Sequence, residues 1–317
     1  MRLKTFVSGL MPRSKELRRA LRSYQKGNID AATLEKSYIE EAEKYISIQK
    51  DAGCEFIQDG MLKWQDLLRP LCNYGGVKEG TLIRWFETNF FYRMPIVEDK
   101  ITYKGPVISN HVITSSLKKD SKSSLTIPDP ITFAILCENR YYNKISELVS
   151  DLSNAMIRDL EILDLDVKAI IIHSPAIGYF GIENEDMNLF ADFLKQVGSL
   201  KKGIKVIVHL SFIKNPRILN SFSKLELDTL SLDLCYGNRL EILKYIPDVS
   251  SLSLGLIDVS TSFIEDKEYL IFEINRILSS RNLREVYVTN STDLDLLPYE
   301  VALQKINILK ELSNYEL

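Results

Sequence analysis

Cationic and aromatic side chains gather in three stretches of the chain, where they could bind a ligand. The candidate ligand-binding residues there are Arg13, Arg18, Arg19, Asp59, Trp64, Trp85 and Asn89. Arginines and a lysine, Lys15, beside aromatic rings suit a flat anionic ligand and a partner protein equally well. The alternative is a solvated amphipathic helix that keeps its arginine heads in water.

A second set of polar residues follows short apolar runs. His173, His209, Asp233 and Asp258 each stand at or just beyond the end of such a run. In barrels of parallel strands the chemistry lies at the carboxyl ends of the strands, so these positions are candidates for a site. A lone histidine at a strand end is more often a hydrogen-bonded structural residue than a catalyst, and this holds for His173.

The elements that carry these residues alternate between short β-branched runs and longer segments of helical period, which is typical of parallel βαβ architecture. Eight strands are expected, at residues 5–9, 55–59, 124–128, 169–173, 205–209, 229–233, 251–257 and 285–289. Their continuous Ile, Val and Leu content indicates burial on both faces. The pattern predicts one (β/α)₈ barrel of α/β class spanning residues 1–317 as a single domain.

Helices are expected between the strands. Ser14 and Asp30 are placed to cap helices at residues 15–26 and 31–52, and later helices are expected at 185–201, 216–221, 239–244, 267–280 and 298–312. Residues 89–123 are irregular. Within them we expect a hairpin excursion over the barrel mouth at residues 92–104, with its turn near Asp99 and Lys100.

Composition excludes several classes of protein. A hydrophobic content of 45% and a charged content of 26% are those of a globular protein with a sizeable core. The net charge of -3 offers no field for a nucleic acid, and apolar runs of about five residues cannot span a membrane. Four scattered cysteines and no secretory signal predict a cytoplasmic protein. One glycine in the turn after the first strand argues against a dinucleotide fold.

Several motifs resemble cobalamin-independent methionine synthase. They are GLMPR at 9–13, ELRRA at 16–20, YQKG at 24–27, WFETNFFY at 85–92 and PDPITF at 128–133. All of these motifs except the last are similar to the amino-terminal barrel of that two-barrel enzyme. Asp59 and Gly60, with Trp64 and Asp66, resemble short archaeal-type versions in which each barrel is a separate polypeptide. Residues 172–176, 254–259 and 298–302 keep the family order, so the likeness covers nearly the whole chain.

The resemblance implies a zinc site in the family's catalytic barrel, where a His-x-Cys, a Glu and a Cys hold a metal that activates the thiol of homocysteine. The matching positions here are His209, Ser211, Asp233 and Thr292, so two hydroxyls replace two thiolates. A neutral hydroxyl supplies neither the charge nor the affinity of a thiolate. We therefore expect a degenerate site without zinc. The alternative is a rearranged zinc site on His209, Asp233 and Cys235, although a buried core cysteine explains Cys235 more simply.

A second departure concerns substrate binding. The family's Asp-Glu-Pro-Ala, whose acid would receive the amino group of homocysteine, reads His173, Ser174, Pro175 and Ala176 here. We expect a zinc-free subunit that pairs with a separate catalytic barrel and assists methyl transfer from a methyltetrahydropterin-like donor, with Arg18 or Arg19 holding the carboxylates of the pterin. The alternatives are an active zinc-dependent homocysteine methyltransferase and a barrel chemistry related to the porphyrinogen decarboxylases.

Overall fold

A computed structural model describes residues 2–118, 120–279, 281–313 and 315–316. Its main sheet is seven-stranded and entirely parallel, in the order β1-β10-β9-β8-β7-β6-β4. The strands are β1 (Lys4–Thr5), β4 (Ser124–Pro128), β6 (Ala169–His173), β7 (Lys205–Leu210), β8 (Thr229–Asp233), β9 (Ser251–Ile257) and β10 (Glu285–Asn290). Seven of the expected strands therefore form, with bounds shifted by a few residues at most.

The remaining expected strand, at residues 55–59, does not form as such. Phe56 and Ile57 make isolated parallel bridges instead, Phe56 to Phe6 beyond β1 and Ile57 to Ser123 before β4. The Glu55 amide donates to Thr5 O at 2.7 Å, and the Ser124 amide donates to Ile57 O at 2.7 Å. The prediction of a complete eight-stranded barrel is thus met only in part, since the sheet has seven strands and the segment between its edges makes only bridges.

Alternate side chains along each strand point into the interior that this sheet encloses. Phe6, Phe56 and Tyr287 are buried and form one aromatic group, with ring centroids 5.7–5.8 Å apart. They belong to a small core cluster with Ile171 and Ile207 that is separate from the large core under the helices. Side chains two residues apart share a face of a strand. His173 and His209 therefore point to the same interior, one layer nearer the carboxyl ends.

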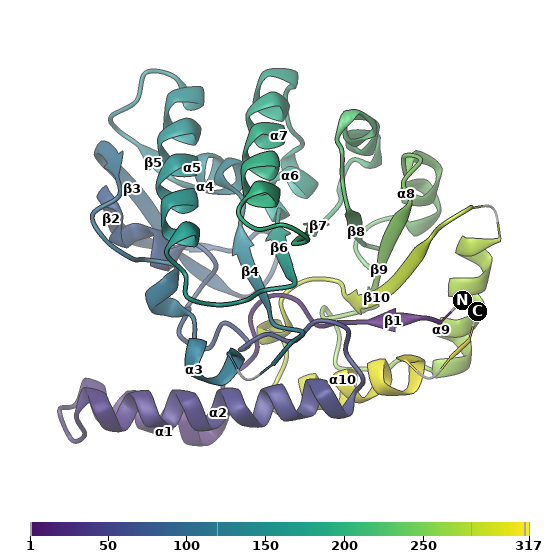
Figure 1. The fold of residues 1–317 in the computed structure, drawn as a ribbon, viewed down its shortest axis with the longest axis horizontal. Coiled ribbons are helices and arrows are strands. Elements are labelled where there is room, and N and C mark those ends of the chain that lie inside the picture. The colour runs from purple at the N-terminus through teal and green to yellow at the C-terminus, as the bar shows by residue number, and fades with distance from the viewer. Residues whose placement is uncertain (1, 119, 280, 314, 317) are drawn as a thin grey trace.

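Helices surround the sheet (Figure 1). They are α1 (Lys15–Gln25), α2 (Ala31–Asp51), α3 (Thr114–Leu117), α4 (Pro130–Leu136), α5 (Ile145–Glu161), α6 (Pro175–Phe180), α7 (Asn184–Ser199), α8 (Arg239–Tyr245), α9 (Lys267–Leu278) and α10 (Tyr299–Ser313). The predicted caps are confirmed: Ser14 accepts from the Leu17 amide and Asp30 from the Thr33 amide. The helix expected at 216–221 is a 3₁₀ helix, Pro216–Lys224, and residue 280 of another expected helix lies outside the described residues.

The two described ends of the chain meet in Figure 1. Arg2 bridges Glu316, and the Leu3 amide donates to Tyr315 O at 3.2 Å. Among the described helices, none is long and apolar enough to cross a bilayer.

A hairpin exists, but its predicted bounds and turn are wrong, because most of residues 92–104 form a single strand. β2 (Gly75–Arg84) pairs antiparallel with β3 (Phe91–Thr102), and β5 (Glu138–Asn139) extends this second sheet. The turn therefore lies at residues 85–90, and Asp99 with Lys100 falls inside β3. Aromatic residues occupy the turn because they pack against the barrel, a long-range contact that local turn chemistry does not report.

Candidate functional site

A cavity of about 300 Å³ opens at the carboxyl ends of β7 to β10. Asp233 contributes polar lining from the last position of β8, and Asp258 and Thr292 do so from the loops that follow β9 and β10. Phe212 lines it after β7, and Phe90 closes it from the hairpin. The cavity thus lies where barrels of this kind carry their sites.

The hairpin tip is fastened to the barrel by Glu87. Its carboxylate accepts from the Tyr179 hydroxyl at 2.7 Å, the Tyr236 hydroxyl at 3.0 Å and the Lys214 ammonium at 3.2 Å. These hydrogen bonds, that of Tyr179 first, lower the pKa of Glu87 to about 2. The three donors follow different strands, so one side chain ties the tip across several loops of the mouth.

Apolar contacts support the same position of the tip. The Phe86 ring lies 4.9 Å from that of Phe212 and 5.1 Å from that of Tyr179, measured between centroids. Phe86 and Phe212 both adopt positive φ, at 47° and 56°. Non-glycine residues at positive φ are uncommon and persist where surrounding contacts hold them. The tip and the loop after β7 are therefore fitted to each other.

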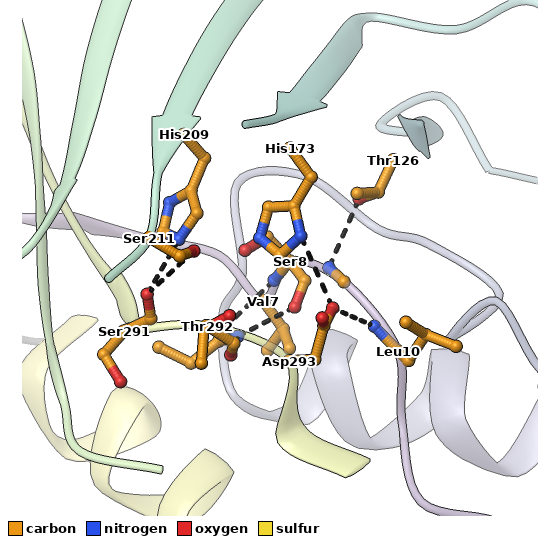
Figure 2. A network of polar contacts seen from close by, with 12 residues as sticks. Val7, Ser8, Leu10, Thr126, His173, His209, Ser211, Ser291, Thr292 and Asp293 are labelled. Carbon is orange, nitrogen blue, oxygen red and sulfur yellow. Dashed lines mark hydrogen bonds and ion pairs between the residues drawn. The ribbon is translucent and has the colours of Figure 1, made fainter. Parts of the chain in front are cut away.

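His209 is fully engaged within the barrel. Its Nδ1 lies 2.8 Å from the Ser231 hydroxyl. Its Nε2 lies 2.9 Å from Ser291 O, as Figure 2 shows. A carbonyl only accepts, so Nε2 carries the proton and Nδ1 accepts from Ser231. Burial, and then the neighbouring His173, lowers the pKa of His209 well below its ordinary value, so the ring is neutral.

His173 stacks on His209 with a centroid distance of 4.7 Å. It is fully buried, and neither of its ring nitrogens has a hydrogen-bond partner among the described residues, although Nδ1 lies 3.4 Å from Asp293 Oδ1. Burial lowers the pKa of His173 to about 3 and raises that of Asp293 to about 7. At neutral pH the imidazole is therefore uncharged.

The Asp233 carboxylate accepts hydrogen bonds from backbone amides of the loops at the mouth of the barrel. Oδ2 accepts from the Phe212 amide at 3.0 Å, and Oδ1 accepts from the amides of Cys235 and Tyr236 at 2.9 and 3.0 Å. Burial raises the pKa of Asp233 to about 6. The Ser211 hydroxyl donates to Ser291 O at 3.4 Å.

These residues do not fit a zinc ion. The nitrogens of His209 and the oxygens of Asp233 already have partners, and Ser211 and Thr292 offer neutral hydroxyls. Within the described part of the chain, no three His, Cys, Asp or Glu side chains are grouped to hold a metal. His209, Asp233 and Cys235 are therefore not assembled as a metal centre, although Asp233 and Cys235 line the same cavity.

Three of the candidate ligand residues are used inside the fold. Arg13 donates from Nε to Leu62 O at 2.9 Å and from Nη2 to Trp64 O, and burial lowers its pKa. Asp59 accepts from the amides of Met61 and Ile113 at 2.9 and 2.8 Å. The Trp64 ring is buried in the core.

The remaining candidates border open space. Arg18 and Lys15 line a groove of about 900 Å³ that Arg13 and Asp295 also border, whereas Arg19 is exposed beside it. Asn89 lines the mouth cavity, and Trp85 lines a smaller cavity next to it. Phe90 and Leu296 border all three spaces, so the mouth cavity and the groove are neighbours.

Sequence reasoning did not single out Glu87, Phe212 or Tyr236, because their roles depend on where the hairpin tip lands. The position of Asp258 just after a predicted strand marked it as a candidate. Nothing else in the sequence distinguished it from the other acidic residues at strand ends.

Comparisons with known proteins agree on one family. Residues 75–281 match the family described as cobalamin-independent synthase, N-terminal domain. The chain is 26% identical over 313 residues to a methionine synthase of Sulfolobus acidocaldarius, covering 97% of this chain and 91% of the relative. A methionine synthase of Sulfurisphaera tokodaii is 25% identical over 314 residues, with the same coverage.

Two solved structures share the fold. A B12-independent methionine synthase from Shewanella, in complex with selenomethionine, superposes with a TM-score of 0.81 at 17% identity, covering 99% of this chain and 97% of that one. A methyltransferase from Methanosarcina mazei superposes with a TM-score of 0.58 at 10% identity, covering 98% and 94%.

Proposed function

The chain belongs to the cobalamin-independent methionine synthase family through that family's N-terminal domain, and from this premise we propose that it is a zinc-free subunit in methionine biosynthesis. It assists the transfer of a methyl group from a methyltetrahydropterin-like donor to homocysteine, which a separate zinc-bearing barrel performs. The observation that carries the proposal is the state of His209, whose two nitrogens are both occupied by hydrogen bonds.

The other positions of the family's metal site support the same proposal. Three backbone amides occupy the oxygens of Asp233, so a metal would have to displace loop contacts to bind there. Hydroxyls stand at Ser211 and Thr292 where thiolates are needed for tight zinc binding. A subunit without its own metal requires a partner that has one.

The methyl donor is proposed to meet this subunit at the groove beside α1. Arg18 and Lys15 line it and Arg19 is exposed beside it, so carboxylates of a pterin donor find cations there. Arg13 is not counted among them because its guanidinium donates to backbone carbonyls.

The same proposal extends to the architecture and location of the chain. We propose that residues 55–57 complete an eight-stranded barrel and that residues 1–317 form one domain; the bridges to Phe6 and Ser123 support closure. A cytoplasmic location is proposed because all four cysteines are free thiols.

The experiment that tests the function measures metal content and homocysteine-dependent methyl transfer together. We expect the purified chain to hold less than about 0.1 zinc per molecule, to be inactive alone, and to raise the turnover of a zinc-bearing catalytic barrel with which it forms a stable complex. Turnover by the isolated chain, or no complex and no effect on the catalytic barrel, would refute the subunit role.

A second candidate is a zinc-dependent homocysteine methyltransferase with a divergent site, favoured by the shared cavity of Asp233 and Cys235. It requires stoichiometric zinc in the untreated protein. Loss of that zinc in His209→Ala, together with loss of methyl transfer by the isolated chain, would replace the first proposal with this one.

A further inference from the structure

We propose that the mouth cavity binds a small organic cation, an ammonium group on an apolar body, with Asp258 as its counter-charge. The inference stands apart from the proposed function, because it concerns neither the methyl donor nor homocysteine. It rests on which charges line the cavity and on which of their hydrogen-bonding atoms remain without partners.

The charged lining is entirely acidic. Glu87, Asp233 and Asp258 contribute carboxylates, and none of the described residues that line the cavity is a lysine or arginine. Two of the three carboxylates have their partners already. Glu87 takes two hydroxyls and one ammonium, and Asp233 takes three backbone amides.

Asp258 retains capacity for a ligand. Its Oδ1 accepts from the amide and the hydroxyl of Ser260 at 2.8 and 2.7 Å. No donor among the described residues reaches its Oδ2. A carboxylate that lines a cavity and keeps one oxygen without a donor can accept from a charged N–H group, and such charge-assisted bonds are the strong ones.

Thr292 gives independent support. Its side chain is buried, with the residue only 2% exposed, and it lines the cavity. Its hydroxyl makes no hydrogen bond within the described part of the chain, whereas its carbonyl accepts from Asn290. The hydroxyl is therefore available to accept a hydrogen bond from a ligand N–H.

The rest of the lining suits an apolar body. Phe90, Phe212, Val259 and Leu296 face the same space. Methylene groups would bury against them, and a cation gains further from the faces of aromatic rings. A volume of about 300 Å³ lies at the small end of ligand pockets, so the ligand is small.

The same charges disfavour an amino acid. Its carboxylate would enter a cavity whose described lining has no lysine or arginine, beside three carboxylates. Like charges in a partly enclosed site repel strongly, so a zwitterion should bind less well than the matching amine.

A matched pair of ligands tests this. Isothermal titration of the full chain at low salt compares 3-(methylthio)propylamine with L-methionine, which differ only by the carboxylate. We expect the amine to bind at least about tenfold more tightly than methionine, and Asp258→Asn to weaken amine binding by about tenfold or more. Glu268→Gln, which removes an exposed carboxylate on α9, is the matched control and should leave binding unchanged.

A second variant keeps the test independent of the folding of Asp258→Asn. Thr292→Val preserves shape and removes the hydroxyl, and should weaken amine binding by roughly three- to tenfold. Equal or tighter binding of methionine, the absence of amine binding at millimolar concentration, or amine binding that both variants leave intact would each overturn the inference. None of these results depends on methyl transfer or on a partner barrel, so failure here and failure of the proposed function are separate outcomes.

Discussion

Gly9, in the loop after β1, lies directly against Asp293 in the loop after β10. Its φ is +78°, and a Cβ there would lie 2.0 Å from Asp293 Oδ1. We expect Gly9→Ala to lower the free energy of unfolding by about 3 kcal/mol, because it combines a strained backbone with a steric clash. Chemical denaturation measures the loss.

Gly27 provides the matched control for that substitution. It shares a positive φ, +72°, but no atom of the described residues would lie within 4 Å of a Cβ added there. Gly27→Ala should therefore cost only the backbone term, about 1 kcal/mol. Equal losses at the two positions would show that Asp293 does not constrain Gly9.

The buried Asp293 makes stability depend on pH. Burial raises its folded pKa to about 7, above the unfolded value, so the folded protein binds the proton more tightly. Its contribution to stability is full below about pH 4 and is lost as pH rises through about 7. We expect Asp293→Asn to reduce the fall in unfolding free energy between about pH 5 and about pH 8 by at least about 1 kcal/mol, measured by urea titration at both values. An unchanged difference would contradict the assignment.

For single residues, the sequence predicted where the site residues lie better than it predicted what they contact. His173 and His209 stand at strand ends as expected. His173 is buried, but its ring nitrogens lack the hydrogen bonds, among the described residues, that a structural histidine was expected to make. The partners of His209 could not be predicted, since Ser231 and Ser291 lie 22 and 82 residues away in the chain.

Among the elements, the β2–β3 hairpin has a tip that Glu87 holds to the barrel by hydrogen bonds. Removing the charge of Glu87 by Glu87→Gln weakens its bonds to Tyr179, Tyr236 and Lys214. We expect amide hydrogen exchange in residues 85–90 to rise by roughly tenfold, with little change in the unfolding midpoint, because the tip opens locally.

The control for the hairpin is Glu79→Gln. Glu79 lies 3.9 Å from Arg93 within the same hairpin, away from the barrel loops that hold the tip. Exchange at the tip should stay at the level of the unchanged protein. A similar rise in both variants would mean that Glu87 does not fasten the tip.

The misplaced turn of this hairpin has a physical explanation. β2 is mostly solvent-exposed and contains three glycines, so it lacks the apolar run by which the other strands were predicted. The turn carries aromatic residues rather than typical turn residues, because Phe86 packs against Tyr179 and Phe212 of the barrel loops. The helices at Ser14 and Asp30 were predicted well, since their caps act within three residues.

For the whole molecule, the sequence predicted a parallel α/β sheet with nearly all of its strands, because each buried strand carries its own apolar run. How the two edges of the sheet meet could not be predicted, because side-chain hydrogen bonds replace part of the backbone pairing there. Gln58 is buried and donates from Nε2 to Val7 O and Gly9 O at 3.1 and 3.2 Å. Its Oε1 accepts from the Thr126 hydroxyl at 2.9 Å, so it connects the edge at β1 to the edge at β4.

This connection leads to a prediction for the sheet as a unit. Gln58→Leu keeps much of the volume but removes the donor to two carbonyls and the acceptor of the Thr126 hydroxyl, so we expect a loss of about 3 kcal/mol in unfolding free energy. Gln25→Leu, at the exposed end of α1, should change it by less than about 0.5 kcal/mol. If Gln58 joins the edges, amide protection must fall together in β1 and β4, which are far apart in sequence but neighbours of the same side chain. Loss of protection confined to residues 55–59 would mean that the two edges are held independently of it.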